Sequence, residues 1–342
     1  MTTKFEERRF LITGTAGFIG FHLAKLLLGE GHRVHGYDGI TDYYDVNLKL
    51  KRHEMLEEFP GFSCTVGMLE DTKLIDEVFD DFQPEVVVHL AAQAGVRYSL
   101  ENPRAYIDSN VVGTFNVMEA ARRVEVKHLL MASTSSVYGA NEDMPFDENQ
   151  KADTQLTIYA ATKKATESMG HSYAHLHGLP ITMFRFFTVY GPWGRPDMAL
   201  FKFTKGILDG APIDIYNNGD MYRDFTYVDD LVRAIYLLTG TPPAHPIEDG
   251  ISSGDSLSPV APYRVVNIGN SDKVRLLDFI NVIEDCLGKK AVRNYMPMQM
   301  GDVPATWANA NLLQQLTGYR PNTGFRCGIE QFVSWFIDYY GK

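Results

Sequence analysis

The chain has few cysteines, no long apolar run and a shortage of basic residues. Its three cysteines, Cys64, Cys286 and Cys327, are scattered without CxxC spacing over 342 residues, which argues against a disulfide framework and predicts reduced thiols in the cytoplasm. No apolar run reaches the roughly 18 residues of a membrane span, and Glu6 and Glu7 near the start do not fit a signal peptide. The net charge of −11 argues against a nucleic-acid partner, because phosphate backbones bind basic faces.

What the chain does have is the composition of a soluble globular protein, 45% hydrophobic and 22% charged. Strand-like apolar runs alternate with helix-like runs, which predicts an α/β fold with a Rossmann-type, doubly wound parallel sheet. The expected strands are 10–13, 33–37, 62–66, 85–89, 128–132 and 182–186, and the expected helices include 18–28, 74–82, 111–123 and 159–177.

A glycine-rich loop follows the first expected strand and opens the first expected helix. Gly14, Gly17 and Gly20 are spaced G-x-x-G-x-x-G, in place of the G-x-G-x-x-G that is commonest in dinucleotide-binding proteins. Small residues let the backbone approach a pyrophosphate, and the free N–H groups at the helix start, at Phe18 and Ile19, face it. An ordinary turn is the alternative, but the strand–loop–helix context favours a nucleotide.

Asp38 follows the second expected strand. A carboxylate there accepts hydrogen bonds from ribose hydroxyls and repels a 2′-phosphate, so NAD is favoured over NADP. The alternative is that Asp38 only caps the strand. Combined with the glycine loop, it predicts an NAD site.

Tyr159 and Lys163 are four residues apart in a run expected to be helical. They therefore share a helix face, and the lysine charge would lower the phenol pKa from its ordinary value of about 10. A phenol with a lowered pKa can exchange protons near neutral pH. Such pairs also occur by chance, so the interpretation depends on the rest of the site.

A cluster of hydroxyls ends the fifth expected strand, at Thr134, Ser135 and Ser136. The carboxyl edge of a parallel sheet is where open α/β folds bind ligands. Capping of the strand end is the alternative role for these side chains. Together with Tyr159 and Lys163 they predict hydride transfer between a substrate and a nicotinamide ring, with Tyr159 moving the proton.

With these motifs the chain resembles the extended short-chain dehydrogenases/reductases that epimerise or dehydrate nucleotide sugars. The resemblance covers residues 10–309 and includes HLAAQAGVR at 89–97, NVVGTFN at 110–116 and RDFTYVDD at 223–230. The segments RYS at 97–99, RFFTVYGPWGRPDMA at 185–199 and MQMGDVP at 298–304 resemble the UDP-glucuronate 4-epimerases of this family.

The resemblance implies a full set of site residues for NAD and a UDP sugar. Tyr159 would take the proton of the sugar 4-hydroxyl, assisted by Lys163 and by the hydroxyls of Thr134, Ser135 and Ser136. The residues expected at NAD are Gly14, Gly17, Phe18, Ile19, Gly20, Asp38, Met68, Leu69, Leu90, Ala91, Ala92, Asn110, Tyr159, Lys163, Phe186 and Val189. The residues expected at the substrate are Arg97, Thr188, Arg195, Arg223 and Asp302.

Two details separate the possible reactions. Dehydratases and decarboxylases of this family carry an acidic residue after the threonine, whereas Ser135 and Ser136 follow Thr134 here. Thr188 and Arg195 suit the carboxylate of a uronic acid, because an arginine fork binds it with two charge-assisted bonds; pairing of Arg195 with Asp197 on the surface is the alternative. The leading prediction is therefore NAD-dependent 4-epimerisation of UDP-glucuronate, ahead of epimerisation of neutral UDP-hexoses, decarboxylation, or a non-catalytic NAD sensor.

Two positions depart from the family pattern. Met68 replaces an acidic residue that would bond the adenine amine, and Gly39 replaces the asparagine that often follows the ribose-binding Asp38. His171 and His175 are one helical turn apart, but no third ligand is evident and we expect no metal.

The two halves of the sequence differ in character. Residues 1–190 are expected to form the NAD-binding domain, and residues 191–342 mainly the UDP-sugar lobe, with segments at about 220–240 and 263–275 returning to the sheet. Residues 239–262 are rich in Pro, Gly and Ser, which predicts a surface loop. By resemblance, a homodimer is expected through the helices at 111–123 and 159–177.

Overall fold

A computed structural model describes residues 6–245 and 252–341. Its centre is a seven-stranded sheet in the order β11-β6-β5-β4-β1-β2-β3, and every neighbouring pair is parallel. The strands are β1 (Arg9–Thr13), β2 (Arg33–Asp38), β3 (Phe62–Val66), β4 (Val86–His89), β5 (His128–Ala132), β6 (Ile181–Phe186) and β11 (Tyr263–Ile268). The predicted fold class is confirmed.

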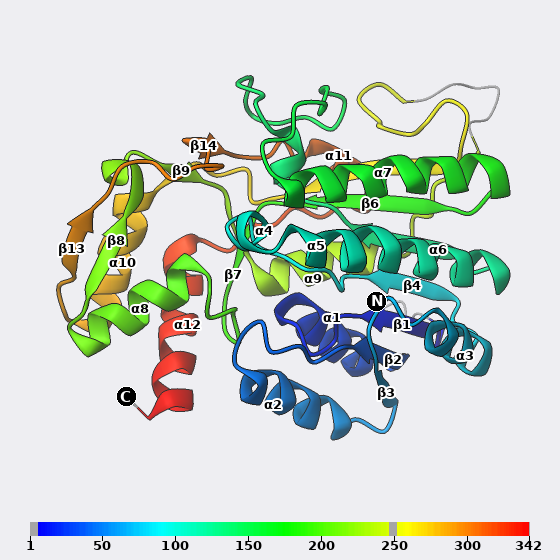
Figure 1. The fold of residues 1–342 in the computed structure, drawn as a ribbon, viewed down its shortest axis with the longest axis horizontal. Helices are drawn as coiled ribbons and strands as arrows, with labels where there is room; N and C mark the ends of the chain where they lie inside the picture. Colours follow the sequence, from blue (N-terminus) through cyan, green and yellow to red (C-terminus); the bar gives the residue numbers. More distant parts are fainter. Residues whose placement is uncertain (1–5, 246–251, 342) are drawn as a thin grey trace.

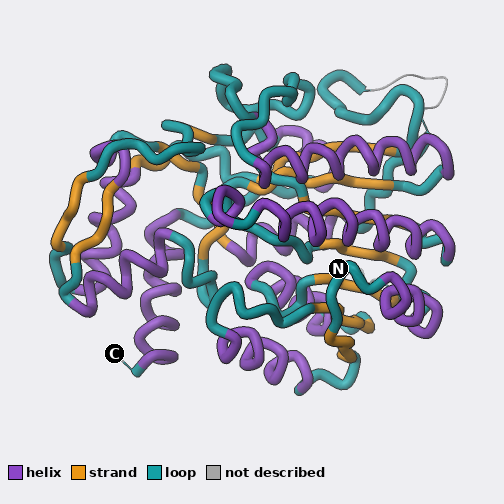
Figure 2. Tube along the Cα trace, viewed as in Figure 1, coloured by secondary structure: helices purple, strands orange, loops and turns teal. Residues whose placement is uncertain are grey.

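Helices cover both faces of the sheet, as Figure 2 shows. Side chains alternate along a strand, so Phe10 and Ile12 of β1 enter one apolar core while Leu11 enters the other. The first core is covered by α1 (Phe18–Gly29), α2 (Val46–Glu57), α9 (Val228–Leu238) and α11 (Asn311–Thr317). The second is covered by α3 (Thr72–Phe82), α6 (Thr114–Arg123) and α7 (Ile158–His177).

A third apolar core lies at one end of the molecule, away from the sheet (Figure 1). It is built by α8 (Ala199–Asp209), β8 (Pro212–Ile215), α10 (Leu276–Leu287) and α12 (Phe325–Tyr340), and β13 (Val292–Tyr295) pairs with β8 at its edge. Short strands connect it to the sheet: β7 (Thr188–Tyr190), β9 (Tyr222–Arg223), β10 (Phe225–Tyr227), β12 (Val274–Arg275) and β14 (Ala305–Thr306). The remaining short helices are α4 (Tyr98–Glu101), α5 (Pro103–Tyr106), η1 (Ile107–Gly113), η2 (Ser135–Tyr138) and η3 (Tyr216–Gly219).

The predicted elements agree with the observed ones except for the helix expected at 111–123. There the chain first forms the π-helical segment η1 and becomes α-helical only at Thr114; the apolar pattern of the sequence does not distinguish these two windings. Of the predicted loop at 239–262, residues 246–251 lie outside the described residues, and the rest contains no helix or strand. None of the helices in 6–245 and 252–341 combines the length and apolar character needed to cross a bilayer.

The strand order locates a binding crevice. After β1 the chain builds β2 and β3 on one side, and then crosses to β4 on the other side of β1. In such sheets the loops leaving the carboxyl ends of the two central strands part in opposite directions, which opens a crevice. Here the crevice lies above β1 and β4, where the glycine loop begins.

A buried carboxyl group holds the long segment after β5 against the far edge of the sheet. Glu148 is 7% exposed, and its Oε1 accepts a hydrogen bond of 2.7 Å from the backbone N–H of Asn267 in β11. Burial raises the pKa of Glu148 from 4.5 to about 7, against the opposing effect of that hydrogen bond. The ionised form is therefore disfavoured in the folded protein.

This shift predicts how stability depends on pH. A carboxyl whose pKa is higher in the folded than in the unfolded chain contributes stability that is lost as pH rises from about 4.5 to about 7. Glu148→Gln keeps the acceptor oxygen but cannot ionise. We expect its free energy of unfolding to exceed that of the wild type by about 3 kcal/mol at pH 8 and by almost nothing at pH 4.5, as measured by urea unfolding.

Burial lowers the pKa values of His89 and His128 to about 3, so these histidines also make stability depend on pH. They are the same in both proteins, so the difference in stability between Glu148→Gln and wild type reports Glu148 alone. Glu142→Gln, at an exposed position of the same segment, is the matched control and should not change the pH profile. A constant difference between Glu148→Gln and wild type from pH 4.5 to 8 would contradict the prediction.

Candidate active site

The glycine loop forms a tight turn between β1 and α1. Gly14 has φ +87°, and a Cβ on it would lie 2.9 Å from the backbone nitrogen of Ala91. Any residue other than glycine would therefore be strained at this position of the turn. A Cβ on Gly20 would lie 2.0 Å from the carbonyl oxygen of Gly14. The N-cap of α1 is Gly17, and no side chain caps this helix end. Its first N–H groups therefore face the cavity described below without a side-chain acceptor, as an anionic group requires.

Asp38 lies at the end of β2, beside the glycine turn. Its Oδ2 accepts a hydrogen bond of 2.9 Å from Ala16 N–H and its Oδ1 accepts one of 2.8 Å from Ile40 N–H. The carboxylate is thereby fixed at the cavity wall. A Cβ on Gly39 would lie 2.7 Å from the sulfur of Met68. The two departures from the family pattern are therefore linked in space, because Met68 packs where a larger residue at position 39 would stand.

Tyr159 and Lys163 lie on one face of α7, next to the end of β5. Lys163 is 4% exposed, its Nζ donates to the Ala132 carbonyl at 3.0 Å, and burial lowers its pKa to about 8. Burial raises the pKa of Tyr159, while a hydrogen bond with Thr134 and the charge of Arg195 lower it. Thr134 and Arg195 are thus the groups that lower the pKa of Tyr159, whereas the sequence predicts the Lys163 charge in this role.

The hydroxyls after β5 combine both roles considered from the sequence. Thr134 caps η2, since its Oγ1 accepts a hydrogen bond of 3.2 Å from Ser136 N–H. Thr134, Ser135 and Ser136 also line the cavity. Capping and facing a ligand are therefore compatible at this strand end.

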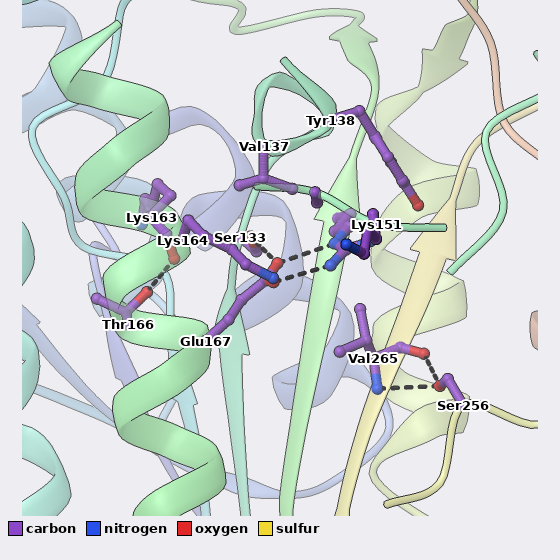
Figure 3. A network of polar contacts seen from close by, with 12 residues as sticks. Ser133, Val137, Tyr138, Lys151, Lys163, Lys164, Thr166, Glu167, Ser256 and Val265 are labelled. Carbon is purple, nitrogen blue, oxygen red and sulfur yellow. Dashed lines mark hydrogen bonds and ion pairs between the residues drawn. The ribbon is translucent and has the colours of Figure 1, made fainter. Parts of the chain in front are cut away.

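A buried ion pair supports this strand end from behind (Figure 3). Glu167, one turn beyond Lys163 on α7, accepts a 2.6 Å hydrogen bond from the Ser133 hydroxyl. Arg185 of β6 donates to both carboxylate oxygens of Glu167, at 2.9 and 2.8 Å, and Lys164 adds a bond of 3.1 Å. Burial acts to raise the pKa of Glu167, but Arg185 holds it below its ordinary value. The pair joins α7, β5 and β6 where Tyr159, Lys163 and Thr134 are held.

Arg195 comes from the loop that follows β7. It forms a two-pronged pair with Asp197, with Nε–Oδ1 of 2.9 Å and Nη2–Oδ2 of 2.5 Å, and its guanidinium carbon lies 5.9 Å from the ring centre of Tyr43. The pair expected as an alternative does form, but it is partly buried rather than on the open surface, with side-chain exposures of 20% and 28%, and Arg195 itself lines the cavity. A ligand carboxylate would meet the remaining Nη1 edge, unless it displaces Asp197.

One cavity of about 680 Å³ joins these groups, a volume typical of small-molecule sites. The predicted residues in its wall are Gly14, Gly17, Phe18, Ile19, Gly20, Asp38, Met68, Leu69, Leu90, Ala91, Ala92, Thr134, Ser135, Ser136, Tyr159, Lys163, Phe186, Thr188, Val189 and Arg195. Residues that the sequence did not indicate include Tyr43, Lys49 and Gln93. Tyr43 and Lys49 come from the segment after Asp38 and from α2, where no motif marks them.

Four predicted residues lie outside the wall of this cavity. Asn110 is fully buried. Its Oδ1 accepts a hydrogen bond of 2.8 Å from the backbone N–H of Gln93, and its Nδ2 donates to the Gln93 carbonyl at 3.1 Å, so it supports the cavity wall from behind. The other three form a separate group: Arg97 Nη2 is 3.6 Å from Asp302 Oδ2, and Arg223 donates to the Val303 carbonyl at 2.8 Å. The structure brings these three together, and their role in substrate binding stays a prediction.

The two helical histidines are held by the polypeptide. His171 Nε2 is 2.8 Å from the Ser258 hydroxyl, and His175 Nδ1 is 2.8 Å from the Val260 carbonyl. Each therefore ties α7 to the segment before β11. Within residues 6–245 and 252–341, no group of three His, Cys, Asp or Glu side chains could hold a metal ion.

Known proteins resemble this chain over most of its length. The profile of the NAD dependent epimerase/dehydratase family matches residues 10–249. A Rhizobium meliloti protein named "Probable UDP-glucuronate 4-epimerase" is 54% identical, over 98% of both chains. The Arabidopsis thaliana protein "UDP-glucuronate 4-epimerase 1" is 44% identical over 97% of this chain and 77% of its own.

A solved structure shares the fold. The crystal structure of UDP-glucuronic acid 4-epimerase from Bacillus cereus, in complex with UDP-glucuronic acid and NAD, superposes with a TM-score of 0.86. The two sequences are 30% identical, over 97% of this chain and 100% of the other.

The buried pair behind β5 gives a prediction about stability. Glu167→Gln leaves Arg185 as a buried charge without its counterion, which should lower the free energy of unfolding by about 3–5 kcal/mol. Glu54→Gln is the control, because the Lys51–Glu54 pair is exposed and its loss should change the free energy of unfolding far less than the loss of the buried pair. Urea unfolding followed by circular dichroism measures both, and equal small losses would show that the Glu167 pair does not stabilise the fold.

Proposed function

Because the chain belongs to the NAD dependent epimerase/dehydratase family, we propose that it is an NAD-dependent isomerase that converts UDP-glucuronate to UDP-galacturonate by 4-epimerisation. The relatives and the solved structure with this activity in their names support the proposal. The observation that carries it is a single cavity with the glycine turn at one end, Tyr159, Lys163 and Thr134 in its wall, and Arg195 beside them.

The chain offers a cradle for NAD. The uncapped start of α1 suits the diphosphate, Asp38 suits the adenosine ribose, and Met68 and Leu69 can pack against the adenine. NAD, when bound, accepts a hydride from C4 of the sugar and later returns it to the other face. Lys163, whose Nζ donates to the Ala132 carbonyl, would also donate to the nicotinamide ribose.

Tyr159 serves as the acid–base group. It takes the proton of the 4-hydroxyl during oxidation and returns it after the 4-keto sugar has turned within the cavity. Its phenol must be deprotonated for the first step, and Thr134 and Arg195 oppose the effect of burial on its pKa. Thr134, with Ser135 and Ser136 alongside, binds the 4-oxygen.

The wall beside Tyr159 favours epimerisation over related reactions. Dehydration and decarboxylation in this family use an acid after the threonine, and Ser135 and Ser136 occupy those positions. Epimerisation needs only proton and hydride exchange at C4. A turnover assay with UDP-glucuronate, followed by NMR, separates the alternatives: UDP-galacturonate supports the proposal, a UDP-pentose indicates decarboxylation, and no product indicates a sensor or a neutral UDP-hexose substrate.

The carboxylate of the substrate imposes a further requirement. After oxidation at C4 the sugar is a β-keto acid, which loses CO₂ when its carboxylate–C5 bond aligns with the carbonyl π system. The enzyme must hold this bond near the carbonyl plane. We propose that Thr188 and Arg195 do so, and that Arg97, Arg223 and Asp302 contact the UDP part.

We also propose a domain division, an oligomeric state and a location. The chain would divide into an NAD-binding domain, residues 1–190, and a UDP-sugar lobe, mainly 191–342, with the segments near 220–240 and 263–275 joining the first. A homodimer would cover the exposed apolar side chains of η1, α6 and α7, which are Ile107, Val112, Phe115, Ile158 and Leu176. Three free cysteines agree with a cytoplasmic location.

Removing the phenol tests the acid–base role. Tyr159→Phe should abolish epimerisation and keep NAD bound, because it deletes one oxygen and little of the packing. Tyr173→Phe, on the same helix and bonded to Glu119, is the matched control and should turn over near the wild-type rate. NMR assays and absorbance of the released cofactor measure both properties, and near-wild-type turnover by Tyr159→Phe would refute the mechanism.

Arg195→Ala tests recognition of the carboxylate. Loss of one charged hydrogen bond corresponds to about 1.5–3 kcal/mol, or roughly ten- to a hundredfold in kcat/KM. We expect that loss with UDP-glucuronate and a much smaller one for residual activity on UDP-glucose, which Arg195 affects only through the pKa of Tyr159. Thr188→Ala should increase the fraction of intermediate that loses CO₂. Equal losses on both substrates, without decarboxylated product, would place the carboxylate elsewhere.

A further inference from the structure

A buried arginine joins the glycine turn to the loop that carries Arg195. Arg52, on α2, is fully buried. Its Nη1 donates to the Ala16 carbonyl at 2.7 Å and to the Tyr44 hydroxyl at 2.8 Å, and its Nη2 donates to the Trp193 carbonyl at 2.6 Å. One guanidinium therefore bridges three segments that are far apart in the sequence.

The chemistry of Arg52 indicates a role beyond filling space. A guanidinium stays charged in proteins, and burying a charge is unfavourable unless its partners compensate. The three partners of Arg52 are neutral oxygens, and its Nε has no partner among the described residues. A methionine would fill a similar volume without this penalty. What an arginine adds is the ability to hold several oxygens in one fixed geometry.

The loop that Arg52 contacts has an unusual backbone. Trp193 has φ +61°, a left-handed conformation that bulky residues rarely adopt. The carbonyl before it is also held, because His22 Nε2 of α1 lies 2.9 Å from Pro192 O. Two side chains from the helices next to the glycine turn thus bind two consecutive carbonyls, and the Trp193 ring packs on Phe21 at 5.8 Å between centroids.

Arg195 follows Trp193 by two residues and stands in the cavity wall. Any shift of the Trp193 carbonyl moves the backbone from which Arg195 projects. The path runs from Asp38, through Ala16 and Arg52, to Trp193, with each step a hydrogen bond of 2.9 Å or less. It connects the side chain expected at the cofactor ribose with the side chain expected at the sugar carboxylate.

We propose that Arg52 is a positioning residue for Arg195. It holds the 191–198 loop against the glycine turn, so that the Arg195 guanidinium stands where it meets the carboxylate of the uronic acid. This inference rests on the proposed function, because it takes that carboxylate as the ligand of Arg195. It predicts that Arg52 governs discrimination between charged and neutral UDP sugars without touching the sugar.

The test is a double-mutant cycle on binding. UDP-glucuronate carries a carboxylate at C6 where UDP-glucose carries a CH₂OH group, so the ratio of their dissociation constants reports the preference for the carboxylate over that neutral group. Both are measured by calorimetry on full-length protein saturated with NAD and carrying Tyr159→Phe, which prevents turnover. The set comprises this parent, Arg52→Met, Arg195→Ala and the double variant, with Lys51→Met as the control at an exposed position next to Arg52 on α2.

We expect Arg52→Met to reduce the preference for UDP-glucuronate by about tenfold or more, the scale produced by small misplacements of a binding group. Arg195→Ala should reduce it similarly, and the double variant no further than Arg195→Ala alone, because residues that act through one another are not additive. Arg52→Lys, which retains the charge but lacks the planar fork, should restore part of the preference, and Lys51→Met should retain all of it.

An unchanged preference in Arg52→Met, or losses that multiply in the double variant, would overturn the proposal. If Arg52→Met does not fold or does not hold NAD, Arg52→Lys and His22→Leu carry the same cycle, and each must lower the preference only when Arg195 is present. Turnover of UDP-glucuronate by the wild type is measured separately. Its absence would refute the proposed function, whereas turnover together with an unchanged preference in the Arg52 variants would refute this inference alone.

Discussion

The approach of Gly20 to the Gly14 carbonyl determines where both halves of the cavity can lie. With a distance of 2.0 Å from a Cβ at position 20 to that oxygen, only glycine allows α1 to begin so close beneath the end of β1. This closeness points the uncapped helix start into the crevice. It also places Ala16 where its N–H reaches Asp38 and its carbonyl reaches Arg52. The cofactor end of the site and the support for the 191–198 loop therefore depend on one backbone contact.

Electrostatics in this protein is local. The chain carries a net charge of −11, yet the proposed ligands are anions. Charges on the surface are screened over about 8 Å at physiological ionic strength, so the side chains in the wall matter most. Lys49, Lys163 and Arg195 line the cavity and offset its acidic residues Asp38, Glu70 and Asp108, and the uncapped start of α1 adds a positive dipole end. These groups can favour a dinucleotide and a uronate although the overall charge does not.

Motifs that act within one turn or one helix were accessible from the sequence. The glycine spacing, the position of Asp38 after a strand and the Tyr159–Lys163 spacing depend on local geometry, and each of these residues lines the cavity. Arg52 and Tyr43 were not accessible as site residues, because their roles depend on contacts with the loop that carries Trp193 and Arg195, more than a hundred residues away. The helix expected at 111–123 also begins with a π-helical segment that its apolar pattern does not encode.

The sequence by itself determined the α/β class, six of the seven strands of the sheet, and the residue types that dinucleotide binding and proton exchange require. Those properties follow from periodicity and from short-range steric rules, which act between residues close along the chain. Only the tertiary structure decided that Arg195 lines the cavity while it pairs with Asp197, that Met68 packs over Gly39, and that Thr134 and Arg195 oppose the effect of burial on the pKa of Tyr159. Burial and the electrostatic surroundings of a side chain arise from segments that meet only in the folded protein, so no local pattern specifies them.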